Sequence, residues 1–579
     1  MRKGFVTSPV DQFEIVEEPL WFGPEERPLF GWLAMPVGGL NRGGVLCAPP
    51  IGREARAGRN AMRCLATSLA ARGFVTLRFD YDGTGDSSGG FNDIGRDKAW
   101  INSVVEATHL LRSFGVESVS AVGMRLGATL IGVAADRHQL ELSSVVLWDP
   151  CESGRSYLRE LNALETIRRD EIQVVVGDSI ETSEFVYSLE TAEEIRRLNL
   201  SKTASSTFGQ RTLVISRSDR AVPARLRAHL RGETINWQST NQQSALLDVD
   251  PSWAALPHQT IGRIVRWLCE SDANFTPLVG RDLPKMAVVA GAESGPSVRE
   301  HCVEIGPERL FGIVTEPTAN QHGPLIVMFN VANEEHTGPS RLWVELSRRW
   351  ASFGLRSVRF DLRGLGDSPW RPDQSETPFF VNGWYDDIVT VARELSSDDP
   401  SNTVFVGLCS GAYWAIEAAL TLGARGVCAI NPPVYIDYLH SVRALEGSRN
   451  PLLRRIGTRL KDVALHRWIA AASWHIVRTF VPTRWAADLL EELERDEIDI
   501  LLLYSVEEIW PFRVAPIFRT IDVQRLRETS TRQIEFIPGL DHGMHFADGR
   551  TQAVGLLDQH VLEHFGGGAR STDAGSVLA

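Results

Sequence analysis

Two long stretches of this sequence repeat each other at a nearly constant spacing. Arg78–Asp80 recurs as Arg359–Asp361, and Phe30-Gly31 recurs as Phe311-Gly312, so residue 80 maps to 361 and residue 30 to 311, an offset of 281 residues. A further match at an offset of 284 pairs Gly123-Met-Arg-Leu-Gly with Gly407-Leu-Cys-Ser-Gly. Such a repeat indicates a duplication, so both copies must form the same architecture.

Each copy alternates short apolar runs with amphipathic segments. The predicted strands are residues 44–48, 74–79 and 118–122 in the first copy, and 325–329, 355–360 and 403–406 in the second. The predicted helices between them are residues 61–72 and 342–353. Short apolar strands separated by amphipathic helices indicate a mostly parallel sheet covered on both faces, which is the α/β fold class.

The length of 579 residues is too great for a single hydrophobic core. A polar stretch rich in Gly, Pro and Ser separates the copies, so we expect a first domain at 1–270, a linker at 271–295 and a second domain at 296–565. The tail, 566–579, is expected to be disordered. We expect the two copies to pack as a roughly two-fold pseudodimer with an interface beyond about 1,000 Å². The oligomeric state of the whole chain stays open.

Charge and composition exclude several function classes. The net charge of −13 argues against a nucleic-acid partner, because phosphate contacts need clustered Lys and Arg. No apolar run reaches the roughly 20 residues that a membrane helix needs, and the first residues do not resemble a secretory signal. The seven cysteines are scattered and odd in number, which favours reduced thiols in the cytoplasm. We therefore expect no membrane association, metal or cofactor.

A candidate nucleophile lies in the second copy. The apolar strand 403–406 leads directly into Gly407-Leu-Cys409-Ser-Gly411 and a small-residue helix, the pattern of a tight turn that exposes a nucleophile at a helix N-terminus. The register places Cys409 at the tip of the turn. The alternative is an inert core cysteine, because free cysteines are often buried.

Three segments carry a resemblance to a known family: Phe-Gly-Pro-Glu-Glu-Arg-Pro-Leu-Phe-Gly at 22–31, Arg-Phe-Asp-Tyr-Asp-Gly-Thr-Gly-Asp-Ser at 78–87, and Arg-Phe-Asp-Leu-Arg-Gly-Leu-Gly-Asp-Ser at 359–368. Both copies resemble the serine aminopeptidase-like α/β-hydrolases, especially the hydrolases that accompany bacterial exosortase systems. The resemblance implies two tandem α/β-hydrolase folds, each with a cap insertion. Cys409 departs from it, because the family usually has Ser there; cysteine at this position resembles dienelactone hydrolases and polyhydroxyalkanoate synthases.

The nucleophile needs a base and an acid that orients the base, and in this fold they follow in the order nucleophile, acid, histidine. The family pattern places the acid at Glu508, after the strand 498–504, with Glu507 as an adjacent alternative. The loop after the last strand contains Asp541-His542, so His542 is the predicted base and His545 the alternative. An ordinary loop histidine is the remaining interpretation of His542.

The oxyanion hole of this fold is built from backbone amides. One belongs to the residue after the nucleophile, Ser410, and the other to the loop after the first core strand of the copy, at Val331. Asn330 could instead donate through its side chain. Ser410 is also interpretable simply as a small residue that the turn tolerates.

The first copy lacks the catalytic residues. Arg125 occupies the turn where Cys409 stands in the second copy, and an always protonated guanidinium is no nucleophile. Aligning Ile235-Asn-Trp with Ile534-Glu-Phe puts Gln243 at the place of His542, and the acid alone survives, as Asp219. The first copy is therefore predicted to be a degenerate hydrolase domain. For Arg125 we weigh an ion pair with Asp219 above the binding of an anion.

A cap is predicted in the second copy at about 432–496. One face of its helical pattern is apolar and the other is basic, which fits either a solvated helix or a dock for an acidic carrier protein or a phosphopantetheine arm.

The predicted function is acyl transfer on an ester or thioester through an acyl-Cys409 intermediate, by a hydrolase, thioesterase or acyltransferase without a cofactor. The substrate is a small-molecule ester or thioester, carried free or on a carrier protein or coenzyme A. The alternatives are a non-hydrolytic lyase or cyclase that uses the same pocket, and a pseudoenzyme scaffold.

Overall fold

The structure is a computed structural model. It describes residues 13–168, 180–182, 185–208, 211–270, 274–291, 295–371, 378, 381, 383–432, 493, 495–506 and 532–566. Described residues up to 270 are called the N-terminal half below, and those from 286 onward the C-terminal half. The predicted cap lies almost entirely outside the described residues, as does the predicted tail from residue 567.

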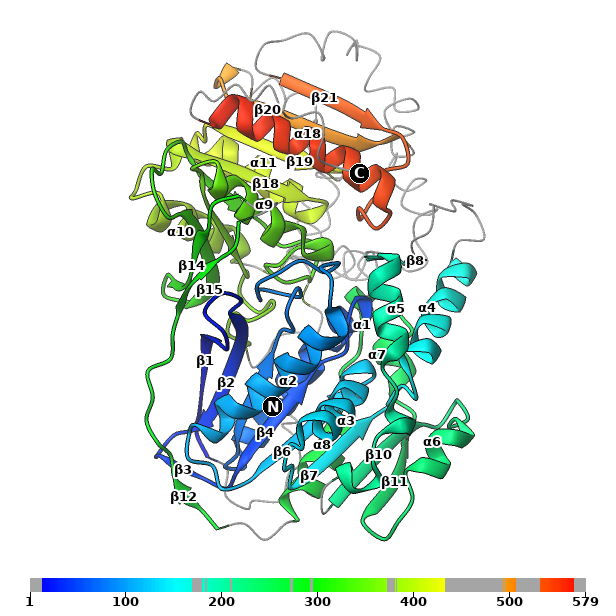
Figure 1. Cartoon of the computed structure of the whole chain (residues 1–579). Coiled ribbons are helices and arrows are strands. Elements are labelled where there is room, and N and C mark those ends of the chain that lie inside the picture. The colour runs from blue at the N-terminus through cyan, green and yellow to red at the C-terminus, as the bar shows by residue number, and fades with distance from the viewer. Residues whose placement is uncertain are drawn as a thin grey trace, which may run out of the picture.

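The N-terminal half is built on an eight-stranded sheet (Figure 1). In spatial order its strands are β1 (Ile15–Phe22), β2 (Leu29–Pro36), β5 (Val75–Phe79), β4 (Gly44–Ala48), β6 (Val119–Met124), β7 (Ser144–Trp148), β10 (Arg211–Arg217) and β11 (Ile235–Thr240). The first three strands pair antiparallel, and all the later pairs are parallel. The central strands are fully buried because helices cover both faces.

The C-terminal half repeats this strand order in a nine-stranded sheet. Its strands are β13 (Met286–Val289), β14 (Val298–Ile305), β15 (Leu310–Pro317), β17 (Arg356–Phe360), β16 (Leu325–Met328), β18 (Thr403–Leu408), β19 (Gly426–Ile430), β20 (Asp499–Ser505) and β21 (Arg532–Ile537). The parallel part runs from β17 to β21. The two sheets therefore have one topology, to which the second adds the edge strand β13.

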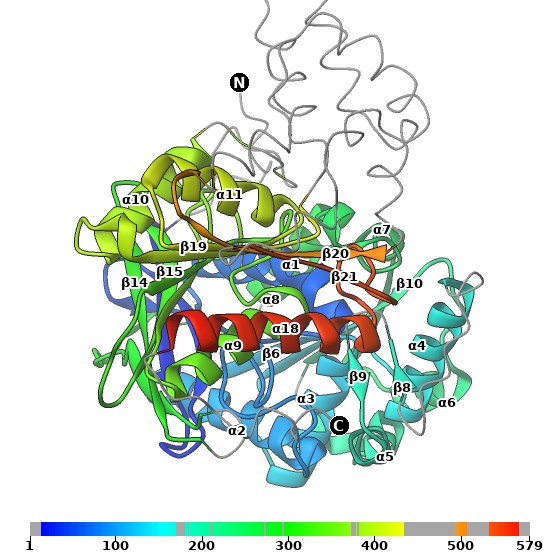
Figure 2. The ribbon, with the colours of Figure 1, turned by 90° about the horizontal axis from the view of Figure 1, so that it is seen from above.

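The helices form a layer on each face of each sheet. In the N-terminal half these are α1 (Arg53–Ala70), α2 (Arg96–Arg112), α3 (Leu126–His138), α4 (Gly154–Arg168), α5 (Leu189–Arg197), α6 (Ala224–His229), α7 (Gln243–Leu247) and α8 (His258–Cys269). In the C-terminal half they are α9 (Leu342–Ser352), α10 (Trp384–Leu395), α11 (Ser410–Leu422) and α18 (Ala547–Phe565). Figure 2 shows α10 and α11 on one face of the second sheet and α9 and α18 on the other.

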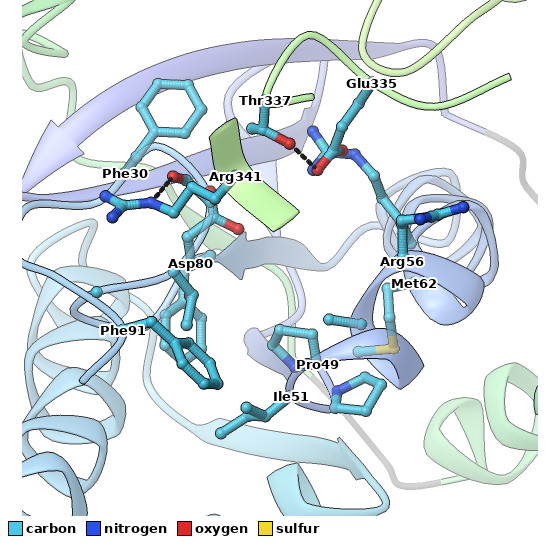
Figure 3. A pocket seen from close by; sticks show the side chains of 18 of the residues that line it. Phe30, Pro49, Ile51, Arg56, Met62, Asp80, Phe91, Glu335, Thr337 and Arg341 are labelled. Atoms are coloured by element: carbon cyan, nitrogen blue, oxygen red, sulfur yellow. Dashed lines mark hydrogen bonds and ion pairs between the residues drawn. The ribbon is translucent and has the colours of Figure 1, made fainter. Parts of the chain in front are cut away.

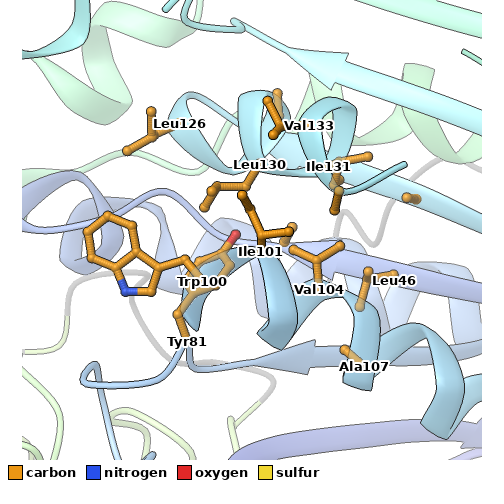
Figure 4. Close-up of a cluster of buried hydrophobic side chains, with 14 of the residues drawn as sticks. Leu46, Tyr81, Trp100, Ile101, Val104, Ala107, Leu126, Leu130, Ile131 and Val133 are labelled. Carbon is orange, nitrogen blue, oxygen red and sulfur yellow. The ribbon is translucent and has the colours of Figure 1, made fainter. Parts of the chain in front are cut away.

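Each sheet has an apolar core on both faces. On one face of the first sheet, Trp100 and Ile101 of α2 pack with Leu130 and Ile131 of α3 against Leu46 of β4 (Figure 4). The opposite face is covered by α1 and α8. Burial of large aliphatic and aromatic side chains in this way is the main favourable contribution to folding, at roughly 25 cal/mol per Å² of apolar surface.

The sequence-predicted elements match the observed ones closely. The strands agree within two residues at either end, and the helix predicted at 342–353 is α9. Helix α1 differs, because it begins at Arg53 rather than at residue 61. Its first eight residues, Arg-Glu-Ala-Arg-Ala-Gly-Arg-Asn, are too polar to show an apolar stripe, and several of them contact the other half of the chain instead of the core.

The described residues between the halves pair with strands of both. Thr276–Pro277 (β12) pairs with Leu40–Asn41 (β3), and β13 joins the second sheet beside β14. The amide of Trp21 on β1 donates to the carbonyl of Pro284 at 2.7 Å. The described residues of the segment predicted as a linker thus contact both halves.

The two halves pack against each other through matched contacts. Arg78 donates to Asp367 at 2.6 Å, and Arg359 donates to Asp86 at 3.1 Å; these are the same two positions of the repeat exchanged between the copies. An apolar cluster at the junction contains side chains from both halves, namely Trp21, Phe30, Trp32, Val289, Val298, Phe311, Ile313 and Ala351. The exchanged Arg–Asp pair is reciprocal, which is the pattern of a two-fold interface, while the expected interface area stays a prediction.

The cap insertion of the N-terminal half is partly described. Between β7 and β10 lie α4, the two-stranded pair β8 (Ile180–Glu181) and β9 (Val186–Tyr187), and α5.

Within the described part of the chain, no helix is both long and apolar enough to cross a membrane.

Candidate active site

Cys409 lies at the tip of the turn between β18 and α11. Its backbone angles are φ 53° and ψ −120°, a strained conformation for a residue with a side chain. The flanking glycines make the turn possible, because a Cβ on Gly407 would lie 2.2 Å from the Gly411 carbonyl oxygen, and one on Gly411 would lie 2.6 Å from that of Asn330. The strain exposes Cys409, which is only half-buried, while the strand behind it is fully buried.

The structure brings Cys409 and His542 together. His542 follows β21, and its Nε2 atom lies 2.9 Å from the Cys409 Sγ atom, within hydrogen-bonding distance for sulfur. His545, the alternative base, instead contacts Asp541, with 2.6 Å between its Nδ1 and the Asp541 Oδ2. Burial opposes ionisation of Asp541, but the hydrogen bond and charge of His545, together with hydrogen bonds from the Phe546 and Gly543 amides, lower the pKa of the carboxyl. His542 is therefore the histidine placed to exchange a proton with the thiol.

Asn431 holds the histidine loop and was not predicted. It follows β19, is completely buried and has a φ of 43°. Its Nδ2 donates to the carbonyl oxygens of Asp541 (3.1 Å) and His542 (3.0 Å), and its Oδ1 accepts from the Ser505 amide at the end of β20. One amide side chain thus joins three strand ends at the site. The sequence signal was weak, a lone Asn after an apolar strand.

The predicted acid, Glu508, and its alternative, Glu507, lie outside the described residues. The described chain reaches Val506, directly after β20. Because β20 pairs in parallel with β21, the end of β20 lies beside the strand that leads to the His542 loop. Both glutamates stay predictions.

The two predicted oxyanion donors lie on segments that contact each other. Ser410 is the first residue of α11, and Val331 lies in the loop from 329 to 341 that follows β16, called the oxyanion loop below. The Ala332 amide, at φ 51°, donates to the Ser410 Oγ at 2.8 Å and ties the loop to the turn. Sequence reasoning missed this role of Ala332, which no motif marks.

Asn330 does not act as a side-chain oxyanion donor in this arrangement. Its Nδ2 donates to the Glu334 carbonyl at 3.0 Å and to Asp361 at 2.9 Å, which uses both amide hydrogens. Its Oδ1 accepts from the Leu362 amide. The alternative of side-chain donation is therefore wrong for this geometry, and Asn330 shapes the loop instead.

A comparison with known protein families matches part of the C-terminal half. Residues 333–554 match the model of the "Alpha/beta hydrolase family". The fold is that of the α/β-hydrolases. No curated protein matches the chain significantly.

Several solved structures of hydrolases are similar to part of the chain. A putative hydrolase from Agrobacterium vitis S4 is 21% identical with a TM-score of 0.31 and covers 44% of this chain and 98% of its own. An esterase from Pyrococcus furiosus is 14% identical with a TM-score of 0.32 and covers 44% of this chain and 91% of its own. The ferulic acid complex of Est1E from Butyrivibrio proteoclasticus is 13% identical with a TM-score of 0.34, and covers 43% and 98%.

In the N-terminal half, the turn between β6 and α3 corresponds to the Cys409 turn and carries a buried cation. Arg125 has angles of φ 55° and ψ −120°, within a few degrees of those of Cys409. Its guanidinium donates to Glu54 at 2.9 Å and Glu160 at 2.7 Å, with Asp149 at 3.5 Å. The expected ion pair with Asp219 is wrong: Asp219 pairs with Arg217 at 2.7 Å. Glu54 of α1 and Glu160 of α4, which are remote from Arg125 in sequence, bind its guanidinium instead.

Gln243 is buried in the N-terminal half, where its Oε1 accepts a hydrogen bond from the Trp148 indole at 2.8 Å. The carboxyl of Asp219 is exposed, and its hydrogen bonds from Arg217 lower its pKa. A cavity of about 130 Å³ borders Arg125, Asp149 and Glu160. Arg125, Asp219 and Gln243, the described residues that correspond to the predicted triad, therefore form no pair of nucleophile and base.

Other cysteines differ from Cys409 in their surroundings. Burial raises the pKa of Cys47 and of Cys151 to about 12. Cys64 and Cys428 are also buried. Because the thiolate is the nucleophilic form, such cysteines are inert.

Two groups in the described part of the chain have the donor atoms for a metal ion. His336, Asp361 and Asp367 lie between the halves and already form ion pairs. His336 pairs with Asp361 and with Asp86, and Asp367 pairs with Arg78. Asp499, His560 and His564 lie where β20 begins, whereas Cys409 and His542 lie beyond the strand ends. Neither group touches the Cys409–His542 pair.

Proposed function

We propose that this chain is an acyl-transfer enzyme of the hydrolase class that acts on an ester or thioester through a covalent acyl-Cys409 intermediate. The observation that supports it is the 2.9 Å approach of His542 Nε2 to Cys409 Sγ at a strained strand-to-helix turn. A thiol next to an imidazole is the arrangement that activates a cysteine nucleophile. The helix N-terminus of α11 adds a partial positive charge that favours negative charge developing on a substrate at the turn.

The first step forms the acyl-enzyme. His542 takes the proton of the Cys409 thiol on Nε2, and the sulfur attacks the carbonyl carbon of the substrate. The carbonyl oxygen becomes an oxyanion, which the amides of Ser410 and Val331 stabilise in this proposal. The intermediate then collapses, the bond to the alcohol or thiol group breaks, and His542 returns its proton to that leaving group.

The second step releases the acyl group. In hydrolysis, His542 removes a proton from water, the hydroxide attacks the acyl-sulfur carbonyl, and the Cys409 thiol leaves with the proton from His542. An alcohol, amine or thiol in place of water gives acyl transfer to that acceptor. Glu508 is proposed to orient His542 by accepting a hydrogen bond from its Nδ1. The cysteine favours thioester substrates, including those on coenzyme A or a carrier protein, because exchange between two thiols is nearly balanced in energy.

The test is intact-protein mass spectrometry after incubation with short and medium acyl-thioesters. The proposal expects a single acyl adduct on the wild-type protein, located at Cys409 by peptide mapping, and none on Cys409→Ala. The matched control is Cys151→Ala, which removes a buried cysteine of raised pKa near Arg125 and should leave the adduct unchanged.

A selective thiol label separates this function from a pure scaffold. Limiting iodoacetamide should modify Cys409 before the other cysteines, because its sulfur is accessible and next to an imidazole. If acyl-thioesters and activated esters leave no adduct and no cysteine is alkylated selectively, the enzymatic proposal fails and a scaffold role stands.

A further inference from the structure

The oxyanion loop is a strained segment. It joins β16 to α9, and Ala332, Ser340 and Arg341 in it have φ angles of 51°, 52° and 68°. Non-glycine residues in this region are strained and persist only where the surroundings hold them in place. The equivalent connection in the N-terminal half, from β4 to α1, is only the four residues 49–52. The C-terminal half thus has an enlarged loop beside its nucleophile.

The N-terminal half contacts the enlarged part of the loop at successive residues. Asn333 donates to the carbonyl of Ser252 at 2.9 Å. Glu334 pairs with Arg56 at 3.0 Å, and Glu335 pairs with Arg59. Arg56 and Arg59 belong to the first turns of α1, which the sequence pattern did not reveal as helix.

His336 is the most buried of these contacts. Its Nδ1 lies 2.8 Å from Asp361 of its own half, and its Nε2 lies 2.8 Å from Asp86 of the N-terminal half. Burial would lower the pKa of His336, but the carboxylates of Asp361 and Asp86 raise it to about 10. Asp361 also accepts a hydrogen bond from Asn330, so the imidazolium connects the base of the loop with the other half.

Arg341 closes the far end of the loop. Its guanidinium donates to three carbonyl oxygens of the N-terminal half, those of Gly85 (2.6 Å), Ser87 (2.5 Å) and Gly89 (2.8 Å). A cavity of about 110 Å³ separates Thr337 and Arg341 from Pro49, Ile51 and Phe91 (Figure 3). Hydrogen bonds from Arg341, rather than close apolar packing, therefore hold this side of the loop.

We propose that the N-terminal half is a clamp that positions the oxyanion loop of the C-terminal half, with His336 and Arg341 as the positioning residues. This inference rests on the proposed function of Cys409. It gives the degenerate half a definite role in the reaction: it fixes the backbone that carries Val331 and Ala332, and thereby the oxyanion donors. Removing a single oxyanion donor typically costs about 10²- to 10³-fold in rate, so a loosened loop should be costly.

The test compares two reactions of the same sulfur in the full-length protein. Acylation by an acyl-thioester passes through an oxyanion, whereas alkylation by iodoacetamide does not. Arg341→Met, which removes the three bonds to the N-terminal half, should slow acylation of Cys409 by about 10- to 100-fold and change alkylation less than about 2-fold. His336→Gln should act in the same direction. Hydrogen exchange of the peptide that spans 329–341 should be faster in both variants.

The matched control is Arg63→Met. Arg63 also joins the halves, by donating to the carbonyls of Gly366 (2.8 Å) and Ser368 (3.0 Å), but it does not touch the oxyanion loop. It should lower the melting temperature while acylation keeps the wild-type rate. If Arg341→Met does not fold, Asn333→Ala removes one contact to Ser252 and should produce a smaller fall in acylation alone.

Three outcomes would overturn the clamp. Equal losses of acylation and alkylation would show that the Cys409–His542 pair itself was disturbed. An equal loss in Arg63→Met would show general destabilisation, and unchanged acylation in all loop variants would show that the loop needs no clamp. A wild-type protein that is not acylated at all marks instead the failure of the proposed function, and the clamp falls with it.

A second observation concerns the group Asp499, His560 and His564, which belongs to neither site. Asp499 begins β20, and the two histidines are four residues apart on one face of α18. His560 Nε2 lies 2.7 Å from one oxygen of Asp499, and His564 Nδ1 lies 2.6 Å from the other. The two rings stack with centroids 4.1 Å apart. His560 is buried and His564 is partly exposed, so an ion and a water molecule could reach the group from solvent.

The neighbour of His560 makes this group more than a pair of hydrogen bonds. His560 Nδ1 lies 3.2 Å from the side-chain oxygen of Gln533 on β21, and donation from Nδ1 to that oxygen would leave Nε2 able to bind a cation. Outer hydrogen bonds of this kind are typical of metal-bound histidines. We infer that Asp499, His560 and His564 bind a divalent ion of the Zn²⁺ type, with water as the fourth ligand.

Isothermal titration with Zn²⁺ and the absorption spectrum with Co²⁺, on untagged and metal-stripped full-length protein, test this site. We expect one bound ion per chain, a rise in melting temperature and at least a tenfold weaker affinity in His564→Ala. The control is His322→Ala, a histidine whose Nδ1 contacts only the Asn320 carbonyl among the described bonds. No binding by the wild type, or equal binding by His564→Ala, would overturn the inference. Enzyme activity is not needed for either readout.

Discussion

The two halves of this chain have the same strand-to-helix turn, with an arginine at its tip in one half and a cysteine in the other. Arg125 and Cys409 share nearly identical φ and ψ angles, and each lies between a buried strand and a small-residue helix. Arg125 is surrounded by the carboxylates of Glu54, Asp149 and Glu160, whereas Cys409 faces one histidine. The strained backbone is therefore a property of the scaffold and its glycines, and it persists where no nucleophile uses it. Chemistry depends on the few side chains that surround the tip.

A second pair of positions sharpens this difference. Asp149 follows β7 and Asn431 follows β19, with φ angles of 48° and 43°. The Asn431 amide donates to the carbonyls of Asp541 and His542, which a carboxylate cannot do. Asp149 instead faces the guanidinium of Arg125, although burial raises its pKa. The amide of Asn431 therefore suits a position beside the histidine loop, and the carboxylate of Asp149 suits a position beside a buried cation.

The largest expected effect is the loss of the nucleophile. Cys409→Ala should lower acyl transfer by at least about 10³-fold, because the covalent route is removed. Arg125→Ser should create no activity, since Gln243 is buried against Trp148 and is not a base. Both are measured by release of a chromogenic acyl-thioester product. Activity that survives Cys409→Ala and disappears with a substitution of Arg125 would reverse the roles of the two halves.

For stability, the substitution of Arg125 should have a larger effect than the substitution of Cys409. Arg125→Met removes the cation that pairs with Glu54 and Glu160, and breaking a buried ion pair from one side typically costs about 3–5 kcal/mol. Urea unfolding should show this loss in the N-terminal half. Cys409→Ala removes one half-buried sulfur and should change the unfolding free energy by less than about 1 kcal/mol. Equal losses would mean that Arg125 is no more structural than the nucleophile.

Asn431→Asp tests the second pair of positions. The new carboxylate would place an acceptor against the carbonyl oxygens of Asp541 and His542, 3.1 and 3.0 Å from the present nitrogen. The histidine loop should shift, and a displacement of about 1 Å can cost roughly 10²-fold in rate. We expect a fall of about 10- to 100-fold in kcat with little change in KM. Asp149→Asn in the N-terminal half is the matched control and should leave kcat unaffected.

The junction between the halves should weaken at high pH. The pKa of His336 is raised from its ordinary value of 6.5 to about 10, with Asp86 and Asp361 as the facing carboxylates and Arg359 beyond Asp86. A raised folded-state pKa contributes its full stability below about pH 6.5 and loses it as pH rises through about 10. The melting temperature should fall over this window, and the fall should be smaller in His336→Gln. Identical pH profiles would assign the effect to other groups.

The sequence allowed the fold to be predicted in most of its parts. The strands were recognisable because buried parallel strands are continuous apolar runs, and Cys409 and His542 stood out because the turn and loop motifs are local. The start of α1 was missed because its polar residues serve the other half of the chain. Ala332, Asn431 and the partners of Arg125 were missed or wrong for a related reason: their contacts join residues far apart in sequence, and no local pattern encodes them.

The smallest effect is expected at the residue after the nucleophile. Ser410 Oγ accepts the hydrogen bond from the Ala332 amide, whereas the corresponding residue of the N-terminal half is Leu126, a buried apolar side chain. Ser410→Ala keeps the backbone amide that serves the oxyanion and loses one hydrogen bond, worth about 0.5–1.5 kcal/mol. Acylation should therefore slow by about 2- to 10-fold, with alkylation of Cys409 unchanged. Complete inactivation by Ser410→Ala, with activity retained in Cys409→Ala, would instead identify Ser410 as the nucleophile and shift the register of the turn by one residue.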